Sequence, residues 1–189
     1  MSANLNNTDH LPLVHHSDPI LKQKLVDFNF DQPLLDPIDL YNQLGTAMIQ
    51  SNGIGLSANQ LGLPFRVFVM RGAEGVIGCF NPIIVDVSEE LIALEEGCLS
   101  YPGLLVKIKR PRYIKVRFTA PDGEIQTHKY ANMTARVFQH EFDHMEGLNF
   151  INRASGIHRE RAVSKLRKLD KVNNLKNILF NKSTRRSVM

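Results

Sequence analysis

The 189-residue sequence contains no uninterrupted run of about eighteen apolar residues, the least that a membrane-spanning helix requires. Its first residues, MSANLNNTDH, also lack the basic and then apolar order of a secretory signal. These absences predict a soluble, cytoplasmic protein with no membrane partner. Internal repeats, low-complexity tracts and long linkers are missing as well, so we expect one continuous fold.

Cysteine is scarce: only Cys79 and Cys98 are present, which excludes a disulfide framework. In a reducing compartment each is expected to be a buried thiol or a ligand. Cys79 lies in an apolar stretch and is predicted to pack in the core. Cys98 lies in the turn-like sequence Gly-Cys-Leu-Ser and needs a separate interpretation.

Most of the chain has few basic residues relative to acidic ones, and the excess of positive charge is concentrated at the C-terminal end. Residues 153–189 contain eleven Lys or Arg and two acidic residues, a net charge of +9, which leaves residues 1–152 with −5. We therefore predict a catalytic body in residues 1–152 and a basic helix and tail in residues 153–189, an extension of the same domain. The basic segment suits a polyanionic partner, although such runs are often solvated helix faces.

Apolar periodicity predicts the main elements. Asp36 followed by Pro37 is typical of a helix start, and this helix is expected to end at Asn52-Gly53. Residues 131–147 are predicted to form a central helix, and an amphipathic helix follows from Ile157. Its predicted apolar stripe comprises Val163, Leu166, Leu169 and Val172. Predicted strands cover residues 65–70, 82–87, 91–96 and 112–118, and a Pro-Asp-Gly turn after the last predicts an antiparallel hairpin.

Two histidines stand four residues apart in QHEFDHMEGLNF, with Glu141 directly after the first. On a helix, His140 and His144 share one face, which is the zinc-peptidase signature. A catalytic zinc site normally needs a third protein ligand and an open position. The third ligand therefore decides between classes of enzyme.

Three candidates for the third ligand can be weighed. A histidine six residues after the second one is excluded, because Phe150 occupies that position. Glu160 would complete a zinc endopeptidase, but it lies between Arg159 and Arg161 in the basic segment. A thiolate at Cys98 would complete a Cys-His-His site, although an isolated cysteine is more often a small buried hydrophobe.

A third motif, GIGLSANQ (residues 53–60), precedes the other two. GIGLSANQ, EGCLS and HEFDH, in this order, closely resemble the three motifs of the peptide deformylases, and the resemblance runs from about Asp18 to Arg153. It implies an α+β fold in which antiparallel β-sheets surround a central metal-binding helix, with the amphipathic C-terminal helix added. It also implies removal of the N-formyl group from formyl-methionine of nascent polypeptides.

The resemblance implies that Cys98, His140 and His144 bind one divalent metal ion. It favours Fe2+ in vivo, and Zn2+, Ni2+ or Co2+ are alternatives in a purified sample. In this interpretation a water on the metal attacks the formyl carbonyl, with Glu141 as general base and then general acid. The amide of Gln60 would stabilise the oxyanion.

The backbone N–H of Leu99 is the second expected oxyanion donor. The family positions also place the substrate: its backbone is expected to pair with Ile54 and Gly55, and Gly97 would serve similarly near the metal. Val137 is expected to line the methionine pocket. The contribution of the neighbouring Arg136 is left open.

Around the ligands, Glu96 is expected to pair with Arg110 and so fix the loop that carries Cys98. Asp143 either orients a ligand or sits on the polar face of its helix, and the second interpretation is favoured. The other histidines have no ligand-like spacing and are assigned none of the chemistry: His10, His15, His16, His128 and His158.

Two partner predictions remain. The basic segment is expected to contact rRNA phosphates on the ribosome, with a solvated helix that covers the body as the alternative. A structural zinc module that docks on the ribosome is disfavoured, because the chain offers no suitably spaced fourth ligand. No oligomer is expected.

Overall fold

The computed structural model describes residues 12–186; His10 lies outside this range, and in the C-terminal helix the side chains are described through residue 173 and at Leu175. The α-helices are α1 (Pro37–Gln50), α2 (Asn132–Met145) and α3 (Gly156–Arg186), and the 3-10 helices are η1 (Pro19–Lys22), η2 (Ala58–Leu61) and η3 (Phe150–Arg153). The strands are β1 (Gly55–Ser57), β2 (Val67–Arg71), β3 (Val76–Val87), β4 (Leu91–Glu96), β5 (Val106–Pro111), β6 (Tyr113–Thr119) and β7 (Ile125–Ala131).

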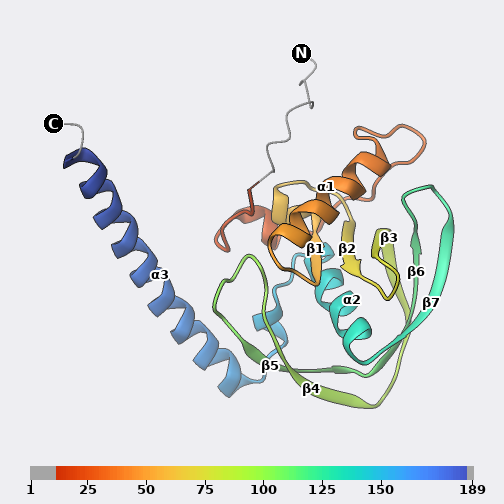
Figure 1. The fold of residues 1–189 in the computed structure, drawn as a ribbon. Helices are drawn as coiled ribbons and strands as arrows, with labels where there is room; N and C mark the ends of the chain where they lie inside the picture. Colours follow the sequence, from red (N-terminus) through yellow and green to blue (C-terminus); the bar gives the residue numbers. More distant parts are fainter. Residues whose placement is uncertain (1–11, 187–189) are drawn as a thin grey trace.

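The strands form two antiparallel sheets, one of five strands in the order β1-β2-β3-β6-β7 and one of β4 and β5. Helix α2 contacts strands of both sheets and lies in the middle of the body, where the strands surround it (Figure 1). The predicted α+β fold with antiparallel sheets around a central helix is confirmed.

Helix α1 begins where the sequence predicts. The Asp36 carboxylate accepts hydrogen bonds from the backbone N–H of Ile38 (2.9 Å) and of Asp39 (3.0 Å), which satisfies two N–H groups that have no partner within the helix. Leu44 and Met48 on its inner face are fully buried against the strands that carry the site. The helix thereby fixes the chain that leads directly into β1.

The predicted hairpin is formed by β6 and β7, and inward residues of β6 alternate with exposed ones as expected. Strand β3 begins at Val76, earlier than predicted, and contains the fully buried Cys79. The predicted core position of Cys79 is therefore confirmed. Strand β5 was not predicted, because one of its three inward positions holds Arg110 in place of an apolar residue.

Helix α2 ends at Met145 and is followed by a turn at Gly147, which has a left-handed φ of +68°. A Cβ atom there would lie 2.8 Å from backbone atoms of Lys22 and Gln23. Glycine therefore permits both the conformation and the close approach of the η1 segment.

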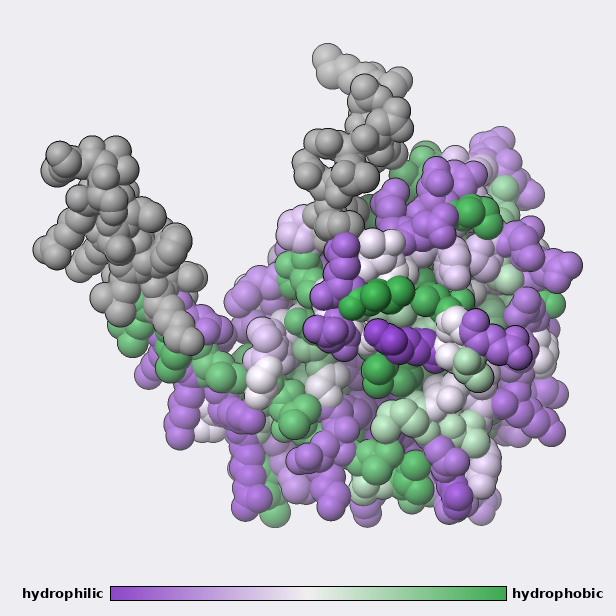
Figure 2. Space-filling view, viewed as in Figure 1, coloured by the Kyte–Doolittle hydropathy of each residue, from purple (hydrophilic) through white to green (hydrophobic). Residues whose placement is uncertain are grey.

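Among the described side chains of helix α3, those that pack on the body lie in its first part. Leu166 and Leu169 contact the cluster that contains Tyr101, whereas Val172 and Leu175 are 48% and 60% exposed. The prediction that Val172 extends the buried stripe is wrong, because the helix diverges from the body towards its C-terminal end (Figure 1). The described part of α3 shows mainly hydrophilic residues with a few apolar ones (Figure 2). Within residues 12–186, no helix is long and apolar enough to cross a membrane.

Candidate metal centre

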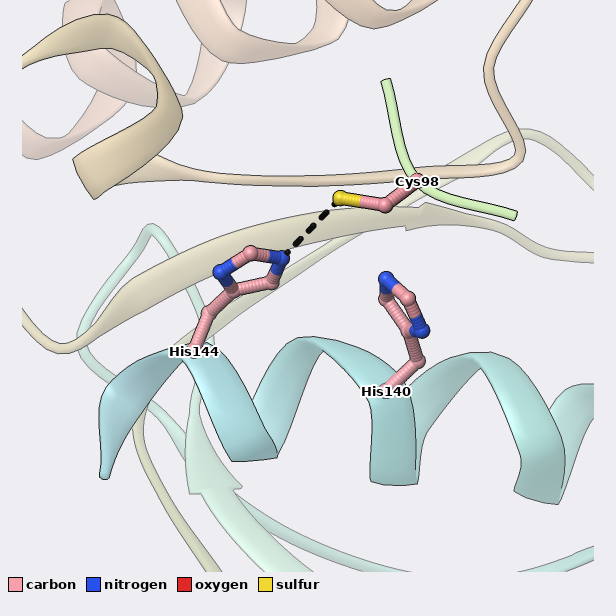
Figure 3. Close-up of side chains that lie close together, drawn as sticks. All are labelled: Cys98, His140 and His144. Atoms are coloured by element: carbon pink, nitrogen blue, oxygen red, sulfur yellow. Dashed lines mark hydrogen bonds between the residues drawn. The ribbon is translucent and has the colours of Figure 1, made fainter. Parts of the chain in front are cut away.

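Three predicted ligands come together above α2. His140 and His144 lie one turn apart on this helix, and both rings point towards the Cys98 thiol on the loop that follows β4 (Figure 3). The Cys98 Sγ lies 3.4 Å from His144 Nε2. One ligand atom from each of the three residues lies within 4.8 Å of the other two.

The donor set fits a divalent transition metal. One thiolate and two imidazoles are ligands that zinc and ferrous iron accept, and three protein ligands leave one position open. His140 is 8% and His144 is 2% exposed, and His144 Nδ1 has no hydrogen-bond partner among the described residues. Burial and the charge of His140 lower the pKa of His144 to about 3, so its ring is neutral and can donate a lone pair.

Glu96, the last residue of β4, orients His140. Its Oε2 accepts from His140 Nδ1 at 3.1 Å, which leaves Nε2 of that ring for a metal. Burial favours the neutral imidazole, but hydrogen bonds to Cys98 and Glu96 raise the pKa of His140 well above its ordinary value. The His140 ring therefore lies in an environment of negative electrostatic potential, which favours a bound cation.

The predicted pair of Glu96 and Arg110 is confirmed as a bidentate contact, with N–O distances of 2.6 and 2.9 Å. Arg136 also donates to Glu96 Oε1 at 2.7 Å and to the backbone oxygens of Ile108 and Ile92. Sequence reasoning left Arg136 open. The feature of the sequence that could have indicated a role for Arg136 is its charge beside the apolar face of the central helix.

The network continues to Asp143, which is 2% exposed. Its carboxylate accepts from Arg110 at 2.8 Å and from Arg153 at 2.6 Å. The favoured interpretation of Asp143 as a polar-face residue is therefore wrong: the carboxylate is buried, and two cations from β5 and η3 compensate its charge.

Gln60 has a defined orientation. Its Oε1 accepts from the backbone N–H of Ser57 at 3.0 Å, and this donor assigns the opposite end of the amide as the NH2 group. Its Nε2 donates to Cys98 Sγ at 3.4 Å and to Ser100 Oγ at 3.2 Å. Donors therefore face the ligand thiol, and Ser57 and Ser100, which sequence reasoning missed, hold them there.

Glu141 projects beside the ligands and is 4% exposed. Burial raises its pKa to about 7, while the charge of His140 acts in the opposite direction. Its Oε2 has no hydrogen-bond partner among the described residues. The carboxylate is therefore positioned and tuned to exchange a proton near neutral pH.

A cavity of about 490 Å3 opens over this centre. Nine of the ten predicted site residues line it: Ile54, Gly55, Gln60, Gly97, Cys98, Leu99, Val137, His140 and Glu141. His144 lies buried behind the other two ligands. A Cβ atom at Gly55 would overlap Glu141 Oε1 and lie 2.9 Å from Val137, so only glycine fits at the start of β1.

The structure disfavours both a zinc endopeptidase and a structural zinc module. In the part of the chain that is described, the ligand group holding His140 and His144 contains Cys98 as its third member and no fourth. Glu160, the third ligand of an endopeptidase, is exposed on α3. The group also lacks the closed four-ligand set of a structural zinc module.

Comparison with known proteins gives a consistent picture. The family model described as polypeptide deformylase matches residues 10–160. The peptide deformylase of Thermotoga maritima is 37% identical over 139 residues, which cover 73% of this chain and 83% of that protein. Among solved structures, a plant peptide deformylase superposes with a TM-score of 0.78 and 31% identity, covering 92% of this chain and 96% of that one. A Synechococcus elongatus peptide deformylase solved with actinonin gives 0.76 and 27%, covering 82% and 86%.

Proposed function

Because the chain belongs to the polypeptide deformylase family, we propose that the centre of Cys98, His140 and His144 is where it carries out the deformylation reaction. The reaction hydrolyses the N-formyl group of an N-terminal formyl-methionine and releases formate. The observation that carries this assignment is the convergence of the three ligand atoms within 4.8 Å beside the buried Glu141.

A divalent cation bound at this centre would polarise the formyl oxygen and lower the pKa of a bound water towards neutrality. We propose Fe2+ in vivo, with Zn2+, Ni2+ or Co2+ able to occupy the same ligands. The three ligands fit these ions because the thiol and both rings converge from two elements whose positions Glu96 and Arg110 fix.

Glu141 acts as the proton carrier in this proposal. With its pKa near 7, the carboxylate can take a proton from the attacking water and give it to the amine when the C–N bond breaks. Oε2 is free of hydrogen bonds within the described residues, so it can face a water in the cavity. The products are then formate and the free N-terminal amine.

Gln60 and the backbone N–H of Leu99 supply the oxyanion donors. The amide is oriented before substrate arrives, because Ser57 and Ser100 fix its two ends. Such preorganised donors contribute roughly 3–4 kcal/mol each to transition-state stabilisation.

The substrate binds along β1. This strand is at the edge of its sheet, so one side is available to pair with an extended peptide at Ile54 and Gly55. The methionine side chain enters the cavity beside Val137, and Gly97 allows close approach on the opposite side. Arg136 lines the same cavity, and its charge is balanced by Glu96.

The test is formate release from formyl-Met-Ala-Ser by anaerobically purified, metal-loaded protein. Acetyl-Met-Ala-Ser is the matched control, because it differs only at the acyl group. We expect formate from the first peptide and no acetate from the second. Absence of metal-dependent formate release would refute the assignment.

We also propose that residues 1–152 form the catalytic domain and residues 153–189 its basic extension, which contacts rRNA on the ribosome. The enzyme would act as a monomer in the cytoplasm. The exposed side chains of Lys165, Lys168 and Lys171 on α3 support the rRNA contact. Phosphate contacts by such residues are weakened by salt.

Ribosome pelleting at several salt concentrations tests the proposal. Replacement of Lys165, Lys168 and Lys171 by glutamine is expected to lower recovery at low salt. The control replaces Lys107, Lys109 and Lys115, which are exposed on strands of the body. Equal, salt-insensitive recovery of wild type and both variants would end the proposal.

A further inference from the structure

A second group of ligand-type side chains lies away from the catalytic centre. His15, His16 and Asp170 each offer an atom within 4.8 Å of the other two. His15 and His16 come from the segment before η1, whereas Asp170 lies on α3. The two segments are separated by about 150 residues in sequence, so spacing alone gave these histidines no role.

The group is held in place from both sides. The backbone N–H of Val14 donates to the carbonyl of Gln60 at 2.9 Å, and that of Asp18 donates to the carbonyl of His15 at 2.8 Å. These two bonds anchor the chain on either side of the histidine pair. His15 Nδ1 lies 2.8 Å from Ser17 Oγ, which restrains that ring.

His16 is the central member. Its Nε2 lies 2.8 Å from Asp170 Oδ1, and its ring stacks on Tyr101 with centroids 5.2 Å apart. The centroids of the His15 and His16 rings lie 4.0 Å apart. Tyr101 therefore supports the His16 ring as an aromatic platform.

We propose that His15, His16 and Asp170 form a second metal site, for a zinc-class divalent cation. Two imidazoles and a carboxylate are a common zinc ligand set, and three protein ligands leave one position for water. Ligand atoms around tetrahedral zinc lie about 3.3 Å apart. The His16–Asp170 contact therefore opens by about 0.5 Å on binding. The exposed His15 and the part-exposed Asp170 can turn to meet the ion.

The position of the site gives it a consequence. Among the described side chains of α3, Leu169 is the last apolar one packed against the core, and Val172 is already half exposed. An ion on Asp170 therefore fastens α3 to the N-terminal segment at the point where the helix departs. Tyr101 stacks against His16 of this second site, and the backbone N–H of Tyr101 donates to the carbonyl of Cys98 at 2.9 Å.

The experiment measures zinc bound by the full-length protein, using equilibrium dialysis and elemental analysis. We expect two ions per chain for wild type and one for His16→Asn and for Asp170→Asn. The matched controls His158→Asn and Glu160→Gln, also on α3, should retain two. The single remaining ion in the first two variants shows that the catalytic body is folded.

Hydrogen exchange of residues 157–173 provides the second readout. Zinc added beyond the first equivalent should slow exchange there in wild type and in both controls, and should leave His16→Asn and Asp170→Asn unchanged. One ion per chain in wild type, a second ion that survives both variants, or a second ion without protection of α3 would each overturn the proposal.

Discussion

Glu96 is a buried carboxylate that accepts hydrogen bonds from Arg110, Arg136 and His140. Burial alone would raise its pKa, but His140 and Arg110 outweigh burial and hold the pKa well below its ordinary value of 4.5. The carboxylate therefore stabilises the folded state while ionised. Its contribution is present above pH 4.5 and is lost as the pH falls below that value.

We expect Glu96→Gln to lower the free energy of unfolding at pH 7 by about 3–5 kcal/mol, because two buried guanidinium groups lose their counter-charge. The difference from wild type should shrink below about pH 4. Urea unfolding of both metal-free proteins at pH 7 and pH 3.5 measures it. Glu95→Gln, the exposed neighbour, is the control and should change stability by less than about 0.5 kcal/mol. Equal losses at both pH values would contradict this account.

Cys79 and Cys98 should differ in reactivity. Cys79 is fully buried in β3, and burial raises the pKa of its thiol well above the ordinary value. Cys98 faces the cavity. Iodoacetamide should therefore modify Cys98 in the metal-free native protein and Cys79 only after unfolding, as peptide mass spectrometry would show. Modification of Cys79 at the same rate as Cys98 would contradict the burial of β3.

At the level of single residues, sequence predicted what a motif or a turn encodes and missed what tertiary contacts create. The ligands and Glu141 were predictable because three motifs carry them. The burial of Asp143 was not, because Arg110 and Arg153 reach it from distant elements. Such pairings leave no periodic pattern.

At the level of elements, α2 depends on the turn that ends it. Gly147 has positive φ, and a Cβ atom there would meet the backbone of Lys22 and Gln23. We expect Gly147→Ala to destabilise the protein by about 1–3 kcal/mol, measured by urea unfolding. Gly156→Ala is the control, since nothing lies within 4 Å of its Cβ position. Similar stability of the two variants would show that the close approach is unimportant.

Secondary structure was predictable where the periodic pattern was intact. The N-cap of α1, the central helix α2 and the β6–β7 hairpin were all confirmed, whereas α1 ends at Gln50, before the predicted Asn52-Gly53. Strand β5 was missed because Arg110 points inward to bind Glu96. The functional requirement at the metal centre thus removed the local signal of the strand.

At the level of the whole molecule, the metal is expected to link parts of the fold. The ligands come from α2 and from the loop after β4, so a bound ion joins elements that the unfolded chain does not hold together. One equivalent of Zn2+ added to metal-free protein should raise the melting temperature, because a ligand 100-fold above its Kd adds about 2.7 kcal/mol. Cys98→Ala should reduce this shift, and an undiminished shift would place the first ion elsewhere.

The overall architecture was predicted by family resemblance, and the path of α3 was not. The apolar spacing of α3 continues to Val172, yet packing of its apolar side chains against the body is seen as far as Leu169, and Val172 is half exposed. A sequence pattern gives the face of a helix that can pack, but the extent of the surface it packs on is set by the rest of the fold.

The most direct measurement compares formate release and bound metal in wild type and Glu141→Gln. Glutamine keeps the shape of the side chain but cannot accept the proton, so we predict unchanged metal content and formate release reduced by roughly 10²–10⁴-fold. Loss of metal together with activity would mean that Glu141 serves the site structurally. Full activity with full metal would contradict the account that Glu141 moves the proton.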